Sequence, residues 1–419
     1  MLKNLLLLYG MLLDKRCRIN FKLLYSTFKA DRNFSVLKLL KLSKEILKGR
    51  KLKYINGHYI FSYAVPPFSS HAFRSFISTG ITEENVFTDL ILNRKKAPDI
   101  FSLAVTDKCP NNCNYCSTKG RMERNELTTA EWIDTVRQIQ DMGTSIIQFT
   151  GGEPLCREDL EEIVEAIDER SLSFVFTRGE ELTESRSKAL KKSGLFGTCI
   201  NLNLDNGNTG ISGAGAIETR LSAVKNSLDA GLYTMVSALI SKKGVTYENI
   251  FDICRSAESL GAHELLLIKP IRAGKLASPE VDSDIFYTEE TMQKMNDIYK
   301  KAVKKFKKIN IFATSLIEWD KTTGCLGGNQ MSYISSSGEL FPCDFLPLSF
   351  GNVKSERLQK IWKQMNEVMG IPKRECMCNS LCEVLRANDL PMPKDISIEL
   401  CHKLRETDYP DFYKNFSQV

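Results

Sequence analysis

The feature that most limits the fold of this chain is an alternation of apolar strand-like runs with helical segments between residues 100 and 270. The strand-like runs are 101–106, 145–149, 172–177, 197–204, 232–240 and 264–269. The helical segments cover about 128–142, 158–169, 183–193, 215–230 and 246–260. Glycines punctuate four of the helix ends, at Gly143, Gly194, Gly231 and Gly261. Repeated βα units predict an α/β protein with a parallel sheet and right-handed crossovers.

The loop after the first strand carries three cysteines, Cys109, Cys113 and Cys116, in the spacing CxxxCxxC. A [4Fe–4S] cubane is normally held by four thiolates, so three on one loop would leave one iron without a protein ligand. Such an iron can chelate the amine and carboxylate of S-adenosylmethionine. Zinc and a disulfide are the alternatives. Structural zinc usually takes four ligands in two nearby pairs, and a disulfide would leave an odd thiol.

A second motif follows the next strand, where residues 149–155 read FTGGEPL. Gly151 and Gly152 allow the backbone to approach a bound ligand closely. Glu153 and the backbone around it, as far as Pro154, could receive the ammonium group of the ligand. A glycine pair alone more often only forms a turn. Here the pair follows the strand after the cysteine loop. Both motifs therefore lie at the carboxyl ends of parallel strands, where enzymes built from repeated βα units carry their chemistry.

These motifs resemble the radical S-adenosylmethionine superfamily, in which the CxxxCxxC loop holds the cluster and a GGEP motif binds the methionine end of the cofactor. The resemblance implies a partial (β/α)6 barrel, since six strands do not complete a barrel of eight. It also implies an enzyme that reductively cleaves S-adenosylmethionine to a 5′-deoxyadenosyl radical and attacks an unreactive C–H bond. An external electron donor of the flavodoxin or ferredoxin type is expected. No side chain stands out as a proton donor or radical relay.

Residues near later strand ends are further candidates. Asn203 and Asp205 lie at or after the fourth strand, where they would either face the ribose of the cofactor or cap the turn. The tripeptide Thr177-Arg178-Gly179 stands where the family often has Thr-Asn-Gly. Arg178 therefore departs from the family pattern at a strand end that faces the expected site.

Six more cysteines lie in the last quarter of the chain: Cys325, Cys343, Cys376, Cys378, Cys382 and Cys401. The spacing from Cys325 through Gly338 to Cys343, around a hairpin expected at 332–341, resembles the SPASM extension, which carries auxiliary iron–sulfur clusters. The block CMCNSLC departs from that family, which has four cysteines at wider spacing. Six thiols predict one complete auxiliary [4Fe–4S] cluster, and a second would need an open iron or a non-Cys ligand. A zinc site built from four of the six is the alternative.

The first 60 residues differ from the rest in charge, with 14 Lys and Arg against 3 Asp and Glu. Leu2–Leu13 is apolar but too short to span a bilayer, and no signal-peptide cleavage site follows it. Ser35–Gly49 is amphipathic: its apolar side holds Val36, Leu39, Leu40 and Leu47, and the lysines lie mostly elsewhere, at Lys38, Lys41, Lys44 and Lys48. Such a helix either lies on an anionic membrane surface or packs on the core. The basic segment lacks interleaved aromatic residues, so no nucleic-acid partner is expected.

We therefore expect a basic N-terminal segment with a hairpin (1–99), a radical SAM barrel (100–310) and a SPASM-like auxiliary-cluster domain (320–405). Residues 51–99 carry no function that we can assign. Thirteen cysteines without a secretory signature indicate a reducing cytosol, with peripheral membrane contact through residues 1–50.

That basic segment favours a lipid-linked or membrane-surface substrate, which the enzyme would oxidise or crosslink. A maturase of a ribosomally made peptide or protein is the alternative. A further alternative, a non-enzymatic iron–sulfur electron carrier, leaves the GGEP motif unexplained.

Overall fold

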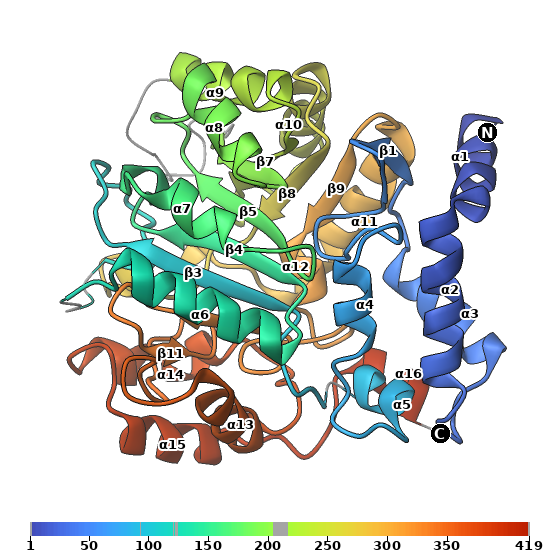
Figure 1. The fold of residues 1–419 in the computed structure, drawn as a ribbon. Helices are drawn as coiled ribbons and strands as arrows, with labels where there is room; N and C mark the ends of the chain where they lie inside the picture. Colours follow the sequence, from blue (N-terminus) through green and yellow to red (C-terminus); the bar gives the residue numbers. More distant parts are fainter. Residues whose placement is uncertain (1, 93, 120, 122–124, 204–216, 418–419) are drawn as a thin grey trace.

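The computed structural model describes residues 2–92, 94–119, 121, 125–203 and 217–417. A nine-stranded sheet forms its centre, in the order β11-β10-β3-β4-β5-β6-β7-β8-β9, and helices pack along the sheet (Figure 1). The strands are β3 (Ile100–Thr106), β4 (Ile146–Gly151), β5 (Leu172–Thr177), β6 (Gly197–Asn201), β7 (Tyr233–Leu239), β8 (Glu264–Ile268), β9 (Asn310–Ala313), β10 (Met331–Ile334) and β11 (Leu340–Phe341).

The run from β3 to β9 is parallel throughout, which confirms the α/β fold with a partial barrel. Six of its seven strands were expected from the sequence. The seventh, β9, pairs with β8 through Glu264↔Asn310 and was not predicted. It has only four residues and follows a long helix directly, so its apolar run is too short to stand out.

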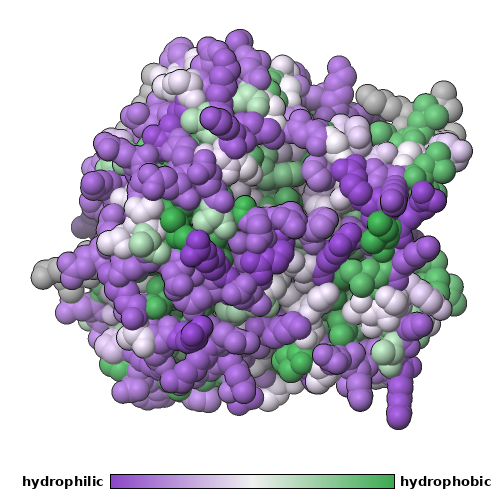
Figure 2. Space-filling model, in the orientation of Figure 1, coloured by the Kyte–Doolittle hydropathy of each residue, from purple (hydrophilic) through white to green (hydrophobic). Residues whose placement is uncertain are grey.

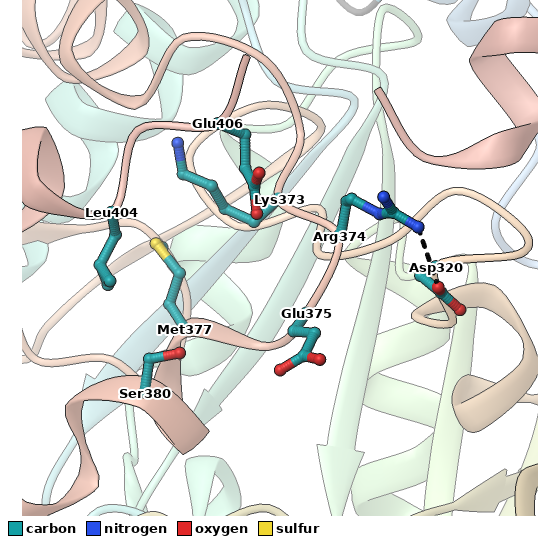
Figure 3. Close-up of a pocket in the computed structure, with 8 residues that line it drawn as sticks. All are labelled: Asp320, Lys373, Arg374, Glu375, Met377, Ser380, Leu404 and Glu406. Carbon is teal, nitrogen blue, oxygen red and sulfur yellow. Dashed lines mark hydrogen bonds and ion pairs between the residues drawn. The ribbon is translucent and has the colours of Figure 1, made fainter. Parts of the chain in front are cut away.

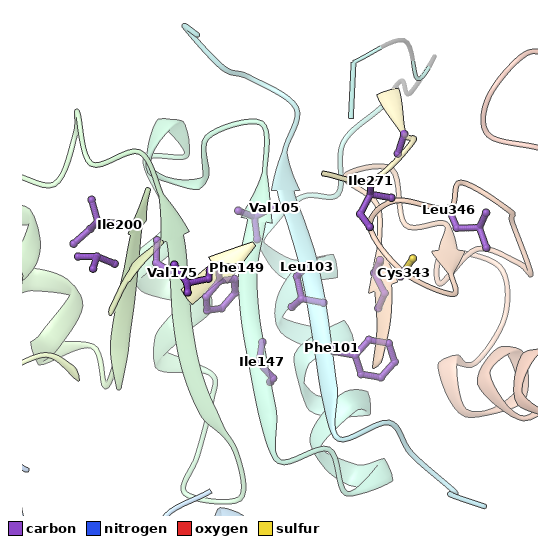
Figure 4. Packing of buried hydrophobic residues seen from close by; sticks show 14 of the residues in the cluster. Phe101, Leu103, Val105, Ile147, Phe149, Val175, Ile200, Ile271, Cys343 and Leu346 are labelled. Atoms are coloured by element: carbon purple, nitrogen blue, oxygen red, sulfur yellow. The ribbon is translucent and has the colours of Figure 1, made fainter. Parts of the chain in front are cut away.

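The outer face of the sheet is covered by the five helices predicted between residues 128 and 260 and by one later helix. They are α6 (Thr129–Met142), α7 (Leu160–Glu165), α8 (Glu184–Lys192), α9 (Ile217–Asp229), α10 (Tyr247–Ser259) and α11 (Glu289–Lys305). The helix starts follow local chemistry: Thr128 and Glu131 form a capping box at the start of α6. Buried side chains of the strands, such as Val175 and Ile200, form one core with these helices (Figure 4).

The opposite face of the sheet is filled by residues that precede the barrel. A hairpin of β1 (Lys53–Ile55) and β2 (His58–Ile60) turns at Asn56-Gly57, both with positive φ, as that dipeptide predicts. The chain after it reaches the start of β8, where Ser62 Oγ donates to Glu264 at 2.7 Å. Phe174, Cys199 and Met235 pack with this segment. Residues 51–65, which had no assigned role, therefore close one end of the barrel interior.

The C-terminal part continues the same sheet. The hairpin β10–β11 joins it through parallel pairing of β10 with β3, at Met331↔Ile100 and three further positions. Helix α13 (Leu358–Met369) packs on α6, and the Trp362 ring lies 6.3 Å from that of Phe101. The buried core runs without a break from the strands to Ile271, Cys343 and Leu346 (Figure 4). The remaining C-terminal helices are α14 (Met377–Arg386), α15 (Lys394–Lys403) and α16 (Asp411–Ser417).

Three helices at the N-terminus form a column beside the barrel (Figure 1). They are α1 (Leu2–Leu13), α2 (Lys15–Phe28) and α3 (Val36–Ile46). Helix α2 buries Leu24 and Phe28 against the short helices α4 (Ala72–Ile77) and α5 (Val86–Ile91). Helix α3 buries none of its eleven residues fully. Of the helices in the described part of the chain, none has the length and apolar character needed to cross a bilayer.

Candidate functional site

The cysteine loop and the Gly-Gly-Glu turn meet at the carboxyl ends of β3 and β4. The Gly152 amide donates to the Thr106 carbonyl at 2.8 Å, and the Glu153 amide donates to the Lys108 carbonyl at 2.8 Å. A Cβ added at Gly152 would lie 2.5 Å from that Lys108 oxygen. Only glycine therefore permits this approach of the two backbones, and the approach fixes where the cysteine loop begins.

The Glu153 carboxylate is buried, with 2% of the residue exposed, and it faces the protein. It accepts hydrogen bonds from Thr177 Oγ1 at 2.6 Å and from the amides of Leu155 at 3.2 Å and Arg178 at 3.0 Å. Burial raises the pKa of Glu153, and these hydrogen bonds oppose that shift. An ionised carboxylate has about four acceptor positions. Three positions are used: the Leu155 amide closes the turn after β4, and the Thr177 and Arg178 donors tie this turn to the end of β5.

The three loop cysteines lie in different surroundings. Cys109 is exposed, Cys113 is buried and Cys116 is intermediate. Burial raises the pKa of the Cys109 thiol, the Asn111 amide opposes that shift, and Glu153, Cys113 and Cys116 add to it. The Arg178 guanidinium donates from Nη1 to Cys113 Sγ at 2.7 Å.

The far side of the loop is held by the chain that follows β8. The Lys275 amide donates to the Cys116 carbonyl at 3.0 Å, and Lys275 Nζ donates to Asn112 Oδ1 at 2.6 Å. A Cβ added at Gly274 would lie 2.2 Å from the Cys116 carbonyl oxygen. The loop is thus clamped between the ends of β4 and β8, and its three thiols suit a cubane held on one side only.

Of the two predicted ribose contacts, Asn203 is among the described residues and Asp205 is not. Asn203 has a positive φ of 45° and follows β6. Asp205 lies outside the described residues, so its predicted place near the ribose stays a prediction.

Four C-terminal cysteines come together at the N-terminal end of α14. The sulfur of Cys376 accepts hydrogen bonds from the Cys325 and Cys378 thiols, and Lys269 lies nearby. These contacts hold the pKa of Cys376 well below its usual range. A hydrogen bond joins Cys378 to Cys343, which completes a group of four thiols. Among the described residues, no group of three His, Cys, Asp or Glu side chains is arranged to hold a single metal ion. Each thiolate of a cubane binds a different iron.

The remaining two C-terminal cysteines do not share these sulfur contacts. Cys401 lies on α15, where burial raises its pKa to about 11 and the charge of Lys373 opposes that shift. Cys382 is buried one turn along α14 from Cys378. Sequence spacing alone did not separate these two from the other four, because that choice depends on how α14 and α15 are oriented.

Contacts between the two cysteine sites include residues that sequence reasoning missed. Ser336 Oγ, after β10, donates to Asp107 Oδ2 at 2.6 Å. Arg121 donates to the Asp344 carbonyl, and its guanidinium lies 5.4 Å from the Tyr333 ring centre. Burial raises the pKa of the Asp344 carboxyl to about 6. The only sequence signal for Asp344 was its position directly after Cys343.

A pocket of 340 Å³ is lined in part by Glu375 and Met377, the neighbours of Cys376 in sequence (Figure 3). Its lining includes Lys373, whose carbonyl accepts from the Cys325 amide at 2.8 Å. Arg374 and Asp320 form an ion pair across it at 3.3 Å. Charged groups of both signs line this pocket, and we assign no ligand to it.

Comparison with known proteins agrees with this geometry. Residues 103–257 match the radical SAM superfamily, and residues 325–383 match the iron–sulfur cluster-binding SPASM domain. The AdoMet-dependent heme synthase of Nitratidesulfovibrio vulgaris is 25% identical over 70% of this chain and 88% of its own length. The PqqA peptide cyclase of Granulibacter bethesdensis is 25% identical over 62% of this chain and 72% of its own. Streptococcus suis SuiB bound to precursor peptide SuiA has a TM-score of 0.55 at 16% identity, over 71% of this chain and 74% of that chain.

A parallel partial barrel with an open-sided cysteine loop, joined to a second group of thiols, defines an iron–sulfur enzyme that uses S-adenosylmethionine. The chain belongs to the radical SAM superfamily and carries a C-terminal SPASM domain. The radical SAM domain binds a [4Fe–4S] cluster and S-adenosylmethionine, and the SPASM domain binds auxiliary iron–sulfur clusters.

Proposed function

We propose that this enzyme oxidises or crosslinks an unreactive C–H position of a peptide or protein substrate. When bound at the cysteine loop, the cluster and S-adenosylmethionine together supply hydrogen-atom abstraction from carbon. The observation that carries the proposal is the junction of the two motifs, where the Gly152 amide meets the Thr106 carbonyl at 2.8 Å. That junction brings a one-sided set of thiols next to a turn that can receive an amino acid.

Within this site, we assign roles to residues of the chain as follows. Cys109, Cys113 and Cys116 hold the cluster from one side. The turn from Gly151 to Pro154 seats the methionine end of the cofactor, and its shape depends on the three hydrogen bonds that Glu153 accepts. Asn203 and Asp205 are proposed ribose contacts.

For the auxiliary site we propose a single cubane on Cys325, Cys343, Cys376 and Cys378, the four thiols that contact one another. Lys269 lies near Cys376, and its partly buried ion pair with Glu318, at 3.2 Å, holds it there. A cation at this position offsets the negative charge of the thiolates. Cys382 and Cys401 would then be structural residues of α14 and α15.

The relatives favour a peptide substrate over the lipid-linked substrate that the N-terminal charge suggested. The PqqA peptide cyclase is a sequence relative, and SuiB has the same fold with its precursor peptide bound. The heme synthase relative gives a second candidate class, a tetrapyrrole. A short precursor reading frame beside the gene for this protein would favour the peptide class.

An activity assay tests the proposal in two steps. The anaerobically reconstituted protein, with dithionite and S-adenosylmethionine, should slowly release 5′-deoxyadenosine and methionine even without substrate, whereas Cys116→Ala should release neither. Intact cleavage in that variant would place the open-sided cluster elsewhere. A candidate precursor peptide should speed the release of 5′-deoxyadenosine. Mass spectrometry of that peptide after the reaction should show the loss of hydrogen. If only a tetrapyrrole does so, the peptide assignment is wrong.

We further propose that the N-terminal helices rest on an anionic lipid surface. The exposed face of α3 combines Leu37 and Leu40, which are 80% and 59% exposed, with Lys41 and Lys44, and exposed Lys48 follows just after the helix ends. Hydrophobic side chains also gather on the surface of α1 (Figure 2). Leucines among lysines complement a membrane interface, where apolar groups are buried and cations meet anionic headgroups. The proposed electron donor of the flavodoxin or ferredoxin type would approach elsewhere.

A further inference from the structure

We propose that Arg178 is a positioning residue that raises the reduction potential of the S-adenosylmethionine-binding cluster, by donating a hydrogen bond to the sulfur of its ligand Cys113. The inference rests on the proposed function, because it takes the cysteine loop as the cluster site. It concerns a residue at which this chain departs from the Thr-Asn-Gly pattern of its family.

The Arg178 side chain is held in place by contacts at several atoms. Its backbone amide donates to Glu153 Oε2 at 3.0 Å, and its Nε donates to Glu180 Oε1 at 3.1 Å. The adjoining Gly179 has a φ of +92°, and a Cβ there would lie 2.7 Å from the Ala223 side chain. The chain direction at Arg178 is therefore set by close packing, and the guanidinium has little freedom to leave the site.

The guanidinium reaches the cysteine loop. Its Nη1 lies 2.7 Å from Cys113 Sγ. Both residues are nearly buried, with 8% of Arg178 and 9% of Cys113 exposed to solvent. The buried Nη2 has no hydrogen-bond partner in the part of the chain that the structure describes. One donor is thus used on the cysteine sulfur, and a second is left for an acceptor on the bound group, such as a cluster sulfide.

Charged groups of both signs lie around Arg178 beside the loop. Glu180 lies between two arginines, with Oε1 at 3.1 Å from Arg178 Nε and 3.9 Å from Arg220 Nε. The Glu153 carboxylate is a second acidic group here, since it accepts from the Arg178 amide at 3.0 Å, and the cation in contact with Cys113 Sγ is the Arg178 guanidinium. Because both arginines are nearly buried, solvent screens this charge weakly.

Reduction adds one electron, and so one negative charge, to a cluster. A hydrogen bond to a ligand sulfur and a nearby cation both stabilise the more negative state, and hydrogen bonds to sulfur are established determinants of cluster potential. An asparagine at this position is too short to make the same contact. Arg178 therefore makes this cluster easier to reduce than the family's usual residue would.

Potentiometric titration followed by electron paramagnetic resonance tests this in the reconstituted full chain without substrate. The S-adenosylmethionine-binding cluster is identified as the signal that changes when the cofactor is added. Arg178→Gln should lower its midpoint, with at least a tenfold drop in the equilibrium constant for one-electron reduction, or about 59 mV. The matched control Arg186→Gln removes a cation that pairs with Glu161, outside the site, and should leave the midpoint unchanged.

An unchanged midpoint in Arg178→Gln overturns the proposal. If that variant does not assemble the cluster, pulsed resonance of the wild type labelled with ¹⁵N-arginine decides instead. Coupling of a guanidinium nitrogen to the reduced cluster supports the hydrogen bond, and no coupling overturns it. Failure of the underlying site assignment looks different: the wild type would then show no signal that responds to S-adenosylmethionine.

Discussion

Gly152 lies so close to the cysteine loop that no larger side chain fits there. Changing Gly152 to Ala should push the cysteine loop away, because the new Cβ would lie 2.5 Å from the Lys108 carbonyl oxygen. We expect the variant to lose about four irons per chain, one cubane, and to keep the auxiliary cluster. Iron analysis after reconstitution measures this. Gly194→Ala is the control: its Cβ meets no atom within 4 Å, and the strain from its φ of +100° falls in the turn between α8 and β6. Full iron content in Gly152→Ala would contradict the close approach.

Single substitutions can also test which cysteines bind the auxiliary cluster. Changing Cys378 to Ser should remove about four irons and leave the cluster on the cysteine loop, because Cys378 belongs to the group of four thiols. Changing Cys401 to Ser should leave the iron content unchanged, since Lys373 rather than another thiol is its charged neighbour. Equal loss in the two variants would show that the ligand set includes α15.

At the scale of helices and strands, local sequence predicted most of the barrel but not which faces are buried. The six βα strands and the Asn-Gly hairpin follow from patterns within a few residues. For α3, however, Leu39 and Leu40 were assigned to one side, whereas Leu39 packs inward and Leu40 is exposed. That outcome depends on where α2 and α5 lie, which no local pattern contains. The grouping of Cys376 and Cys378 with Cys325 likewise depends on tertiary contacts.

Membrane binding by α3 is a prediction about a whole helix face. Replacing Lys41, Lys44 and Lys48 together with Gln should weaken binding to anionic vesicles, by up to about 1 kcal/mol for each lysine. Vesicle flotation measures this, and high salt should weaken wild-type binding as well. The control is a variant that also loses three exposed lysines, but on and just after α11: Lys300, Lys304 and Lys307.

If the wild-type protein does not bind anionic vesicles at low salt, the proposal that the N-terminal helices rest on a lipid surface is wrong. Substitution is a cleaner test than deleting residues 1–50. Helix α2 covers Phe73 and Phe87, so the deletion would expose core.

For the molecule as a whole, the segment before the barrel is part of its core. Glu264 ties that segment to β8, since its carboxylate accepts from Ser62 Oγ at 2.7 Å and from the Tyr63 amide at 2.8 Å. Glu264→Gln puts an amide donor where these donors point. We expect a loss of about 1–3 kcal/mol in unfolding free energy, measured by urea denaturation. Exposed Glu248→Gln, on α10, should change it by less than about 0.5 kcal/mol. Equal stabilities would show that residues 51–65 do not support the barrel.

The pairing of β10 with β3 has a consequence for how the protein is made. Ile100 pairs with Met331, so one edge of β3 has no partner while the ribosome adds more than two hundred residues. At about 5–20 residues per second, that wait is about 10–50 s. An unpaired apolar strand edge invites association with other chains. The nascent protein should therefore need chaperone cover until its last quarter emerges, and slower translation between β9 and β10 should reduce its soluble yield.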